Sequence, residues 1–277
     1  MISVSVIIPT YNEQDNIGRC LESLLSQTLT SFEIIVVDDG STDFTLEIVA
    51  GFKKVKILKQ KHKGPGSARN KGAKQAKGTI LVFVDADMTF EKNFLKNLIR
   101  PIEKGITIGT FSKDEFVANM DNNWAKSWSI VRGFEKGKMH PSDYPDEQAV
   151  FRAIRKDAFL SVGGFDEDRG YDDDWTLSEK LGIKATAVQK AKFYHYNPES
   201  IQEIWLQSKW LSKRKYKFGL LGKFLRLMSV SLPISLLRST QIMLKHQSVY
   251  VGLTQIVSDL AMSIGILEEI IFEKVSK

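Results

Sequence analysis

Thr79-Ile-Leu-Val-Phe-Val-Asp-Ala-Asp87 joins an apolar run to two carboxylates. The run from Thr79 to Val84 is apolar along nearly its whole length, which predicts a strand buried on both faces of a sheet. The two acids follow directly, and side chains two residues apart on an extended chain point the same way. Two close carboxylates repel each other, and a divalent cation relieves that repulsion. This D-x-D pattern therefore predicts a site where Asp85 and Asp87 hold Mg²⁺ or Mn²⁺ together with phosphate oxygens; the structural alternative is a solvated turn.

The sequence around this stretch alternates short apolar runs with helical patterns. The predicted strands lie at residues 4–8, 32–37, 55–58 and 79–84, and the predicted helices at 16–27, 43–49 and 67–76. We expect Pro9 to end the first strand and Asp43 to cap the second helix. Strands and helices that alternate at this pitch predict a Rossmann-like α/β fold, in which a mainly parallel sheet is flanked by helices on both faces.

Polar residues gather where the predicted strands end. Thr10-Tyr11-Asn12-Glu13 follows the first strand, and Asp38-Asp39 follows the second. In open parallel sheets, ligands bind in the crevice beyond the carboxyl ends of the strands. A carboxylate such as Asp39 accepts hydrogen bonds from a nucleobase N–H or a ribose hydroxyl, and the ring of Tyr11 suits stacking on a base. The alternatives are turn chemistry for the two acids and ordinary packing for the tyrosine.

A glycine-rich segment, Gly64-Pro-Gly-Ser-Ala-Arg-Asn70, leads into the third predicted helix. It brings backbone N–H groups and the guanidinium of Arg69 to a place where they suit a diphosphate. The segment is not G-x-x-x-x-G-K-[ST], and no G-x-G-x-x-G occurs, so P-loop and dinucleotide sites are excluded. The alternative for this segment is an ordinary loop and helix start.

A third acidic cluster, Asp172–Asp174, lies in Tyr171-Asp-Asp-Asp-Trp175. Like charges this close raise the pKa of at least one member, which suits a general base. The acids also favour the dipole of a helix predicted over 175–181, and both roles are compatible. His195 ends a strand-like run and is a candidate further metal ligand through its neutral imidazole, the alternative being a structural histidine.

Composition excludes several classes of protein. The chain has 277 residues, of which 43% are hydrophobic and 26% charged, so it is neither disordered nor collagenous. Its length allows one large domain, or one domain with an appendage. The single Cys20 excludes an internal disulfide and a Cys-based zinc site, and its place on an apolar helical stripe predicts a buried thiol. The N-terminus lacks the basic segment of a signal peptide, so we expect the catalytic part in the cytosol.

The positive charge of the chain is confined to its C-terminal part. The net charge is +6, residues 1–200 are neutral overall, and seven basic residues without an acid lie between Lys209 and Arg226. Trp205, Trp210 and Tyr216 interleave with these cations, which favours an anionic membrane surface as the partner of residues 205–226. The neutral catalytic part argues against nucleic acid as that partner.

Two apolar runs, 220–237 and 249–267, follow the basic stretch. Their length is close to the roughly 20 residues that a spanning helix needs, but Lys223, Arg226 and Pro233 interrupt the first and Asp259 the second. We therefore expect helices that lie in the cytoplasmic leaflet as a peripheral or monotopic anchor rather than clean spans. The alternative is a soluble helical subdomain packed on the catalytic part.

Four motifs together resemble the family 2 glycosyltransferases. They are Ile7-Ile-Pro-Thr-Tyr-Asn-Glu13, Val36-Val-Asp-Asp-Gly-Ser-Thr-Asp43, Gly66-Ser-Ala-Arg-Asn-Lys-Gly72 and Val84-Asp-Ala-Asp87. Each is weak alone, but their order and spacing are specific, and the resemblance covers residues 2–200. It implies a GT-A fold, with a catalytic domain over 1–200 divided into a nucleotide-sugar part (1–110) and an acceptor part (111–200). Residues 201–277 would form the membrane-associated helical extension.

The resemblance also implies roles for individual residues. The donor nucleotide sugar would contact Pro9, Thr10, Tyr11, Glu13, Asp38, Asp39, Arg69, Asp85 and Ala86. Asp87 would be the firmer metal ligand, with Asp85 and His195 beside it. Aligning Leu177-Ser-Glu-Lys-Leu181 with the end of the family's Glu-Asp motif makes Asp174 the expected base, with Asp173 as the contender.

The expected reaction is an inverting transfer from a UDP- or GDP-sugar to an acceptor hydroxyl, assisted by Mn²⁺ or Mg²⁺. Because a sugar hydroxyl needs a strong base and a polyprenyl phosphate does not, the acidic cluster favours a lipid-linked glycan at the cytoplasmic membrane face. The alternatives are a polyprenyl- or dolichyl-phosphate glycosyl synthase and a non-catalytic nucleotide-sugar binding module. A nucleotidyltransferase would be expected to carry a Lys-bearing, Gly-rich loop near the N-terminus, where this chain has Pro9-Thr-Tyr-Asn-Glu13.

Overall fold

The computed structural model describes residues 3–167, 170–214 and 216–272, with the backbone alone at 170–172 and 272. The strands are β1 (Val4–Thr10), β2 (Phe32–Asp38), β3 (Val55–Lys59), β4 (Ile80–Phe83), β5 (Met88–Phe90), β6 (Gly109–Ser112), β7 (Glu115–Val117), β8 (Glu147–Gln148), β9 (Ala153–Arg155), β10 (Ala185–Val188) and β11 (Phe193–His195). The α-helices are α1 (Ile17–Leu25), α2 (Thr45–Ala50), α3 (Pro65–Gln75), α4 (Phe94–Glu103), α5 (Asn123–Val131), α6 (Lys156–Ser161), α7 (Thr176–Leu181), α8 (Ile201–Leu211), α9 (Gly219–Ser229), α10 (Leu232–His246) and α11 (Val249–Phe272). A short 3₁₀ helix, Gly170–Trp175, leads into α7.

In the described part of the chain, the strands form an eight-stranded sheet in the order β3-β2-β1-β4-β9-β6-β10-β8 and a three-stranded sheet in the order β5-β11-β7. β3, β2, β1 and β4 are mutually parallel, which confirms the mainly parallel sheet. The exception beside them is β9, which runs antiparallel to β4 and β6. β9 has only three residues, which are too few for the alternating pattern of a strand to be recognised in the sequence.

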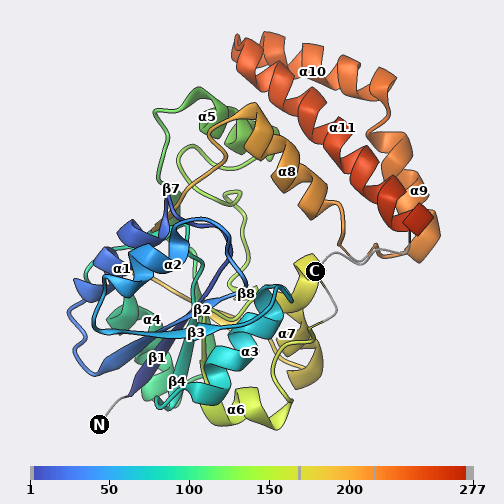
Figure 1. Cartoon of the computed structure of the whole chain (residues 1–277). Coiled ribbons are helices and arrows are strands. Elements are labelled where there is room, and N and C mark those ends of the chain that lie inside the picture. Colours follow the sequence, from blue (N-terminus) through green and yellow to red (C-terminus); the bar gives the residue numbers. More distant parts are fainter. Residues whose placement is uncertain (1–2, 168–169, 215, 273–277) are drawn as a thin grey trace.

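Helices cover both faces of the large sheet, as Figure 1 shows. On one face, Val6 and Ile8 of β1 pack in a cluster with buried residues of α1, α2 and α4. On the other face, Ile7 packs with residues of α3, α6 and α7. Adjacent residues of one strand thus point into opposite hydrophobic cores. Each fully buried aliphatic side chain contributes about 1.5–3 kcal/mol to the stability of the fold. Cys20 is part of the first core and is buried as predicted.

Two local predictions were wrong by a residue or two. Pro9 does not end β1, which continues to Thr10. β1 pairs with β4 only as far as Ile7. The missing N–H of Pro9 therefore interrupts no hydrogen bonding between these two strands. Asp43 is not the cap of α2, because that helix begins at Thr45 and its cap is Phe44. The carboxylate of Asp43 still accepts a hydrogen bond from the Thr45 N–H at 3.0 Å. It therefore provides a hydrogen-bond acceptor for the first turn of α2, although it lies one residue before the cap.

The start of α3 is held tightly behind the ends of the strands. Gly64, just before the helix, has φ +93°, a conformation that favours glycine. Within α3, a Cβ on Gly72 would lie only 2.5 Å from Cγ2 of Ile7 in β1, so the helix can approach the strand only without a side chain there. This close packing fixes Arg69, which lies between the two glycines, at the edge of the sheet.

The C-terminal helices form a group beyond the sheet. In Figure 1, α8 lies between the sheet and the pair α10–α11, and α11 packs against α5, α8 and α10. The predicted run 220–237 is not one helix, because α9 ends at Ser229 and α10 begins at Leu232, with a bend of 54° between them. Over Val249–Ile271, α11 is long and apolar enough to cross a membrane, and 44% of that window is buried inside the molecule.

Candidate active site

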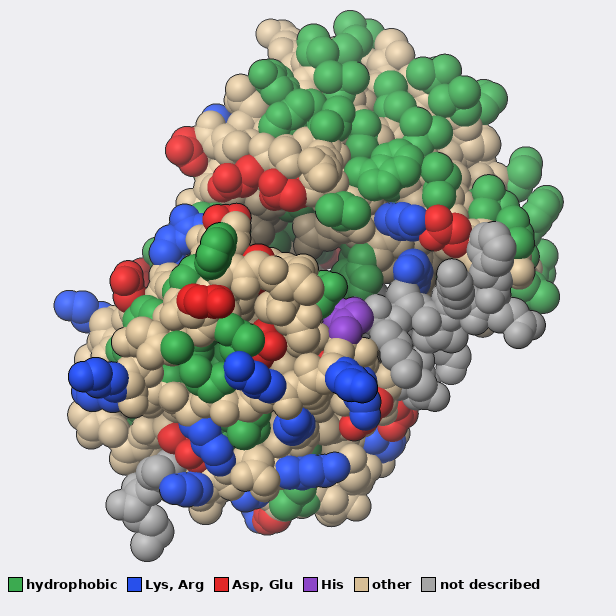
Figure 2. Space-filling view, viewed as in Figure 1, with side chains coloured by type: hydrophobic (Ala, Val, Ile, Leu, Met, Phe, Trp, Pro, Cys, Tyr) green, Lys and Arg blue, Asp and Glu red, His purple; other side chains and the backbone are tan. Residues whose placement is uncertain are grey.

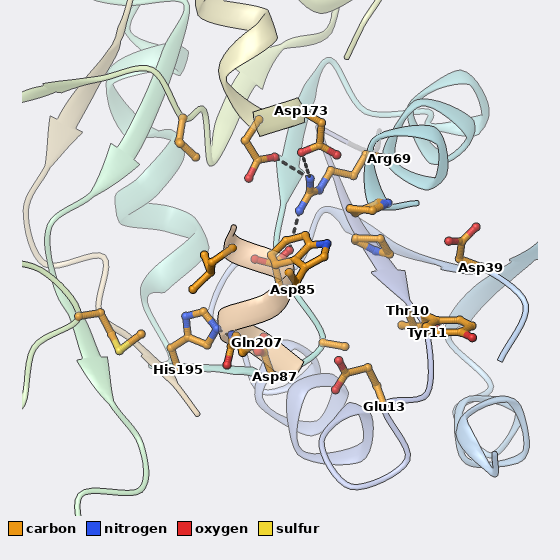
Figure 3. A pocket seen from close by; sticks show the side chains of 18 of the residues that line it. Thr10, Tyr11, Glu13, Asp39, Arg69, Asp85, Asp87, Asp173, His195 and Gln207 are labelled. Atoms are coloured by element: carbon orange, nitrogen blue, oxygen red, sulfur yellow. Dashed lines mark hydrogen bonds and ion pairs between the residues drawn. The ribbon is translucent and has the colours of Figure 1, made fainter. Parts of the chain in front are cut away.

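A cavity of about 680 Å³ lies at the carboxyl ends of the parallel strands. All the predicted site residues line it except Asp38. Figure 3 shows Tyr11 and Asp39 at one end, His195 at the other, and Arg69, Asp85 and Asp173 between them. Asp38 instead folds back on its own turn, where its carboxylate accepts hydrogen bonds from the N–H groups of Gly40 and Ser41 at 3.3 Å. The side chain of Asp172 lies outside the described residues.

The ends of β1 and β2 are joined at Asp39. Its N–H donates to the carbonyl of Thr10 at 2.8 Å, which holds the two strand ends side by side. Its buried carboxylate accepts from the backbone N–H groups of Lys63 and Gly64 at 2.9 and 2.8 Å. The side chain of Gln60 donates to it at 2.7 Å, and Nδ1 of His62 lies 2.9 Å from its Oδ2. Asp39 is therefore held rigidly by the loop before α3.

Arg69 binds three carboxylates in the centre of the cavity. Its Nη2 donates to Asp85 at 2.8 Å, and its Nη1 donates to Asp173 at 3.1 Å and to Asp174 at 2.6 Å (Figure 3 draws the first two). The guanidinium is buried. Although burial opposes a buried charge, these three carboxylates raise the pKa of Arg69 above its ordinary value. Arg69 therefore links the D-x-D segment to the third acidic cluster.

Asp85 is neutralised from two sides. Its Oδ2 accepts from Nη1 of Arg152 at 3.1 Å, in addition to the bond from Arg69. Burial would raise the pKa of Asp85, but the two guanidinium groups outweigh it and hold that pKa well below its usual range. Asp85 is thus a permanent anion in neutral solution, and both of its oxygens already have partners.

Asp173 and Asp174 occupy different environments although they are neighbours. Asp173 is buried, and this burial raises its pKa to about 8, against the effect of Arg69 and with the support of the charge on Asp174. The side chain of Asp174 is 29% exposed and faces the same cavity. Gly66 makes room for Asp173, because a Cβ there would lie 2.7 Å from its Oδ2. Of the two, Asp174 is the carboxylate that an acceptor can reach.

Asp87 and His195 form a second charged group with Glu115. Nε2 of His195 is 3.0 Å from Oδ2 of Asp87, and Nδ1 is 2.9 Å from Oε1 of Glu115. Burial would lower the pKa of His195, but the two carboxylates raise it well above the usual value. Each ring nitrogen of His195 thus faces a carboxylate oxygen, and its role as a metal ligand stays a prediction.

Asp87 is the residue that fits a divalent cation. Its Oδ1 is buried and has no hydrogen-bond partner among the described residues. Within the described ranges, no group of three or more His, Cys, Asp or Glu side chains is arranged to hold a metal ion alone. Mg²⁺ is typically bound by one or two carboxylates together with substrate phosphates. A single open carboxylate oxygen therefore suits an ion that arrives with a diphosphate.

Glu13 lies beside this group, on the loop between β1 and α1. Burial and the charge of Asp87 raise the pKa of Glu13 to about 7. Its Oε2 accepts from Nδ2 of Asn16 at 3.0 Å, and its backbone N–H donates to Oγ1 of Thr45 at 2.7 Å. Glu13 thus adds a carboxyl group with a near-neutral pKa to the end of the cavity where Asp87 lies.

The other wall of the cavity is mostly apolar and comes from later parts of the chain. It consists of Trp128, Arg132, Phe134, Met139, Val150, Trp175, Gln207, Trp210 and Leu211. Figure 3 labels Gln207, which belongs to α8, among the residues that line the cavity. The lining thus extends beyond residue 200, where the sequence predicted a change of domain.

Several of these residues were missed from the sequence. Glu115 and Arg152 lie in or next to three-residue strands, which carry no readable pattern. Trp210 was assigned to a membrane interface because cations surround it in the sequence. The available signal was the spacing of Gln207 and Trp210, which places them on one face of α8.

Comparisons with known proteins agree on the class of this chain. The family model "Glycosyl transferase family 2" matches residues 5–163. The glycosyltransferase GlyA of Streptococcus pneumoniae is 33% identical over 242 residues, which cover 75% of this chain and 32% of GlyA. The chain spans about a third of the length of the first curated relatives it matches.

Two solved structures share the fold. The mannosyltransferase PcManGT from Pyrobaculum calidifontis, in complex with GDP-Man and Mn²⁺, has a TM-score of 0.62 at 20% identity and covers 98% of this chain and 88% of its own. TarS of Staphylococcus aureus, residues 1–349 in complex with UDP-GlcNAc, has a TM-score of 0.60 at 19% identity, with 95% and 90% covered. At these identities the likeness concerns the fold, and it confirms the predicted GT-A type.

Proposed function

Because the chain belongs to glycosyl transferase family 2, whose model matches residues 5–163, we propose that it moves a sugar from a nucleoside diphosphate to a hydroxyl group of an acceptor. One observation carries this proposal. Asp39, Asp87 and Asp174 lie 135 residues apart in sequence at the extremes, yet all line one cavity at the strand ends. Had they lain on separate surfaces, no common substrate could contact them.

The donor would lie along the strand ends. Tyr11 and Asp39 offer a stacking ring and an acceptor at the end where a base would bind. The complexes of TarS with UDP-GlcNAc and of PcManGT with GDP-Man support a UDP- or GDP-sugar as the donor class. The diphosphate would then reach the D-x-D segment.

The metal site would be Asp87 with Asp85 nearby, and the ion would be Mn²⁺ or Mg²⁺. The unpartnered Oδ1 of Asp87 is the ligand atom that the structure offers. A bound ion would neutralise the charge that develops on the departing diphosphate. His195, whose other ring nitrogen lies next to Glu115, is beside Oδ2 of Asp87 and would be the further ligand.

The base would be Asp174. Its carboxylate is within reach of the cavity, whereas Asp173 is buried and holds its proton at neutral pH. Asp174 would take the proton of an acceptor hydroxyl while that oxygen attacks the anomeric carbon from the face opposite the diphosphate. A single displacement inverts the configuration of the sugar and needs no covalent sugar–enzyme intermediate.

The acceptor would be a lipid-linked glycan at the cytoplasmic face of a membrane. α9 exposes Leu220, Leu221, Phe224 and Leu225, and Arg214 and Lys217 are exposed just before it. Figure 2 shows hydrophobic side chains gathered over the region of α9, α10 and α11, in contrast to the charged surface around the sheet. Lys209 and Lys223 of the predicted basic stretch instead pair with Glu268 and Glu269 of α11. Lys215 lies outside the described residues.

A panel of UDP-, GDP- and TDP-sugars with and without Mn²⁺ tests the donor. A ligand that binds the folded protein at 100 times its Kd stabilises it by about 2.7 kcal/mol, which a thermal-shift measurement detects. We expect one donor to raise the melting temperature, and more so with Mn²⁺. If none does so at millimolar concentration, the donor class is wrong.

Replacing the base tests the reaction. Asp174→Asn should keep donor binding but lose turnover by about 10²- to 10⁴-fold, measured as release of nucleoside diphosphate. Asp157→Asn is the matched control, because Asp157 is an exposed acid on α6, paired with Arg155. Normal turnover in Asp174→Asn would exclude its role as base. Binding without any turnover in the unsubstituted protein would favour the non-catalytic binding module.

A further inference from the structure

Neighbouring groups surround the carboxylate of Asp39. Oδ1 accepts from Gln60 Nε2 at 2.7 Å and from the Lys63 N–H at 2.9 Å. Oδ2 accepts from the Gly64 N–H at 2.8 Å, and Nδ1 of His62 lies 2.9 Å from it. A nucleobase that is to bind Oδ2 of Asp39 must therefore displace the ring of His62 or the Gly64 N–H.

His62 is the donor that can leave. The N–H groups of Lys63 and Gly64 belong to the backbone that begins α3, and Gln60 is fixed by its own N–H, which donates to the Asp38 carbonyl at 2.8 Å. The side chain of His62 is 43% exposed. Rotation of its side chain releases Asp39 without moving the main chain.

The ring of His62 already has the two contacts that a base would make. It lies against the ring of Tyr11, with centroids 4.1 Å apart and planes inclined by 31°. Its Nδ1 is hydrogen-bonded to the Asp39 carbonyl at 3.3 Å and lies 2.9 Å from Oδ2 of Asp39, so this nitrogen acts as a donor. A flat ring on Tyr11 with an N–H toward Asp39 is also what a uracil or a guanine would present there.

We propose that the imidazole of His62 occupies the nucleobase position between Tyr11 and Asp39, and that the base of the donor binds by displacing it. This inference rests on the proposed function, since it assumes a nucleoside diphosphate sugar as donor. It makes His62 a specificity-determining residue. A base with a ring N–H, such as uracil or guanine, can donate to the Oδ2 that His62 uncovers, whereas cytosine offers no ring N–H.

Calorimetric titration of UDP, GDP and CDP in the presence of Mn²⁺ tests the displacement. In His62→Ala the competing ring is gone, so the affinity for the preferred nucleotide should rise about threefold to tenfold, the equivalent of one hydrogen bond. His62→Phe keeps a ring that can stack on Tyr11 but cannot donate, and its affinity should lie between the two. His246→Ala is the control, because His246 is an exposed histidine at the end of α10.

Weaker or unchanged binding in His62→Ala would overturn the proposal, since weaker binding means that the base lies between Tyr11 and His62. A second readout uses the unsubstituted protein. The imidazole signals of His62 in a ¹H–¹⁵N spectrum, assigned by their loss in His62→Ala, should shift on addition of the nucleotide, and a signal that stays in place contradicts displacement. If no nucleoside diphosphate binds even the control, the proposed donor class fails together with this inference. Binding to the control without a gain in His62→Ala overturns only the inference.

Discussion

Arg69 shows how one buried side chain organises the candidate site. Its guanidinium fork contacts Asp85, Asp173 and Asp174, which come from two distant parts of the chain. A planar fork can bridge several carboxylates, whereas the point charge of a lysine cannot do so in the same geometry. With Arg152, which also binds Asp85, the arrangement places two cations among three acids, and the excess negative charge is relieved when Asp173 keeps its proton.

The protonation of Asp173 predicts a pH dependence of stability. Because its pKa is about 8 in the folded protein and about 3.9 in an unfolded chain, the folded state binds the extra proton between these values. Stability from this group therefore falls as the pH rises from about 4 to 8 and levels off above 8. Asp173→Asn lacks this contribution. The melting temperature of the variant minus that of the unsubstituted protein should therefore be at least about 2 °C higher at pH 9 than at pH 5.

Thermal unfolding of both proteins across this pH range measures the difference. Asp173→Asn also loses the contact with Arg69. The difference in melting temperature at a single pH therefore does not show whether Asp173 is protonated. The slope of the difference is the diagnostic quantity. A difference that is flat or declines with pH would mean that Asp173 is ionised in the folded protein.

At the scale of elements, the strand ends were predictable and the later wall was not. Parallel strands end at one edge, so the acids after β1, β2 and β4 had to meet once those strands were recognised. The partners of these acids depend on pairing across long separations. Arg152 reaches Asp85 from a position 67 residues away, and Glu115 reaches His195 from 80 residues away. No local sequence pattern indicates contacts between residues so far apart in the chain.

The C-terminal helices show the same limit. Helical periodicity predicted helices there, but it does not indicate which face of α8 turns inward. Trp210 carries cations around it in the sequence, and still lines the cavity. Pro233 lies in the first turn of α10, a position that proline favours, so it marks a new helix after the bend rather than an interruption within one.

The packing of α11 on α8 predicts the effect of a single methyl group. A Cβ on Gly265 of α11 would lie 2.1 Å from Oγ of Ser212 and 2.9 Å from the carbonyl of Lys209. Gly265→Ala should therefore lower the free energy of unfolding by about 1–3 kcal/mol, because the two helices must move apart. Thermal or urea unfolding measures the loss.

A matched glycine provides the control for this prediction. Gly18 lies inside α1, and a Cβ there would meet only Cγ2 of Ile48 at an ordinary 3.7 Å. Gly18→Ala should be neutral or stabilise by up to about 1 kcal/mol through helix propensity. If Gly265→Ala unfolds no earlier than Gly18→Ala, then α8 and α11 are not in close contact at this point.

At the scale of the whole molecule, the net positive charge and the exposed apolar surface lie in the same part of the chain. Residues 1–200 are neutral, and the +6 of the chain lies in residues 201–277, which also carry the exposed leucines of α9. We expect the protein to sediment with vesicles that contain an anionic lipid, less so with neutral vesicles, and less so at high salt. The expected contact is α9, because its apolar face is exposed along the helix.

Two substitutions on that face test the contact. Leu220 and Phe224 are four residues apart on one side of α9, so a double change to Asp should lower vesicle binding at least about tenfold. Ile106→Asp is the control, since Ile106 is an equally exposed apolar residue far from α9 in the sequence. Vesicle binding that survives the double change while the fold is intact would place the contact elsewhere or exclude it.

The wall that α8 supplies to the cavity has a consequence for biosynthesis. Ribosomes deliver the acids at the strand ends first, and Gln207 and Trp210 follow them in the order of synthesis. A nascent chain halted before α8 would present a charged basin open to water on one side. Enclosure of the cavity therefore comes only after all of its carboxylates have been made, and it coincides with the emergence of the segment that would meet the bilayer.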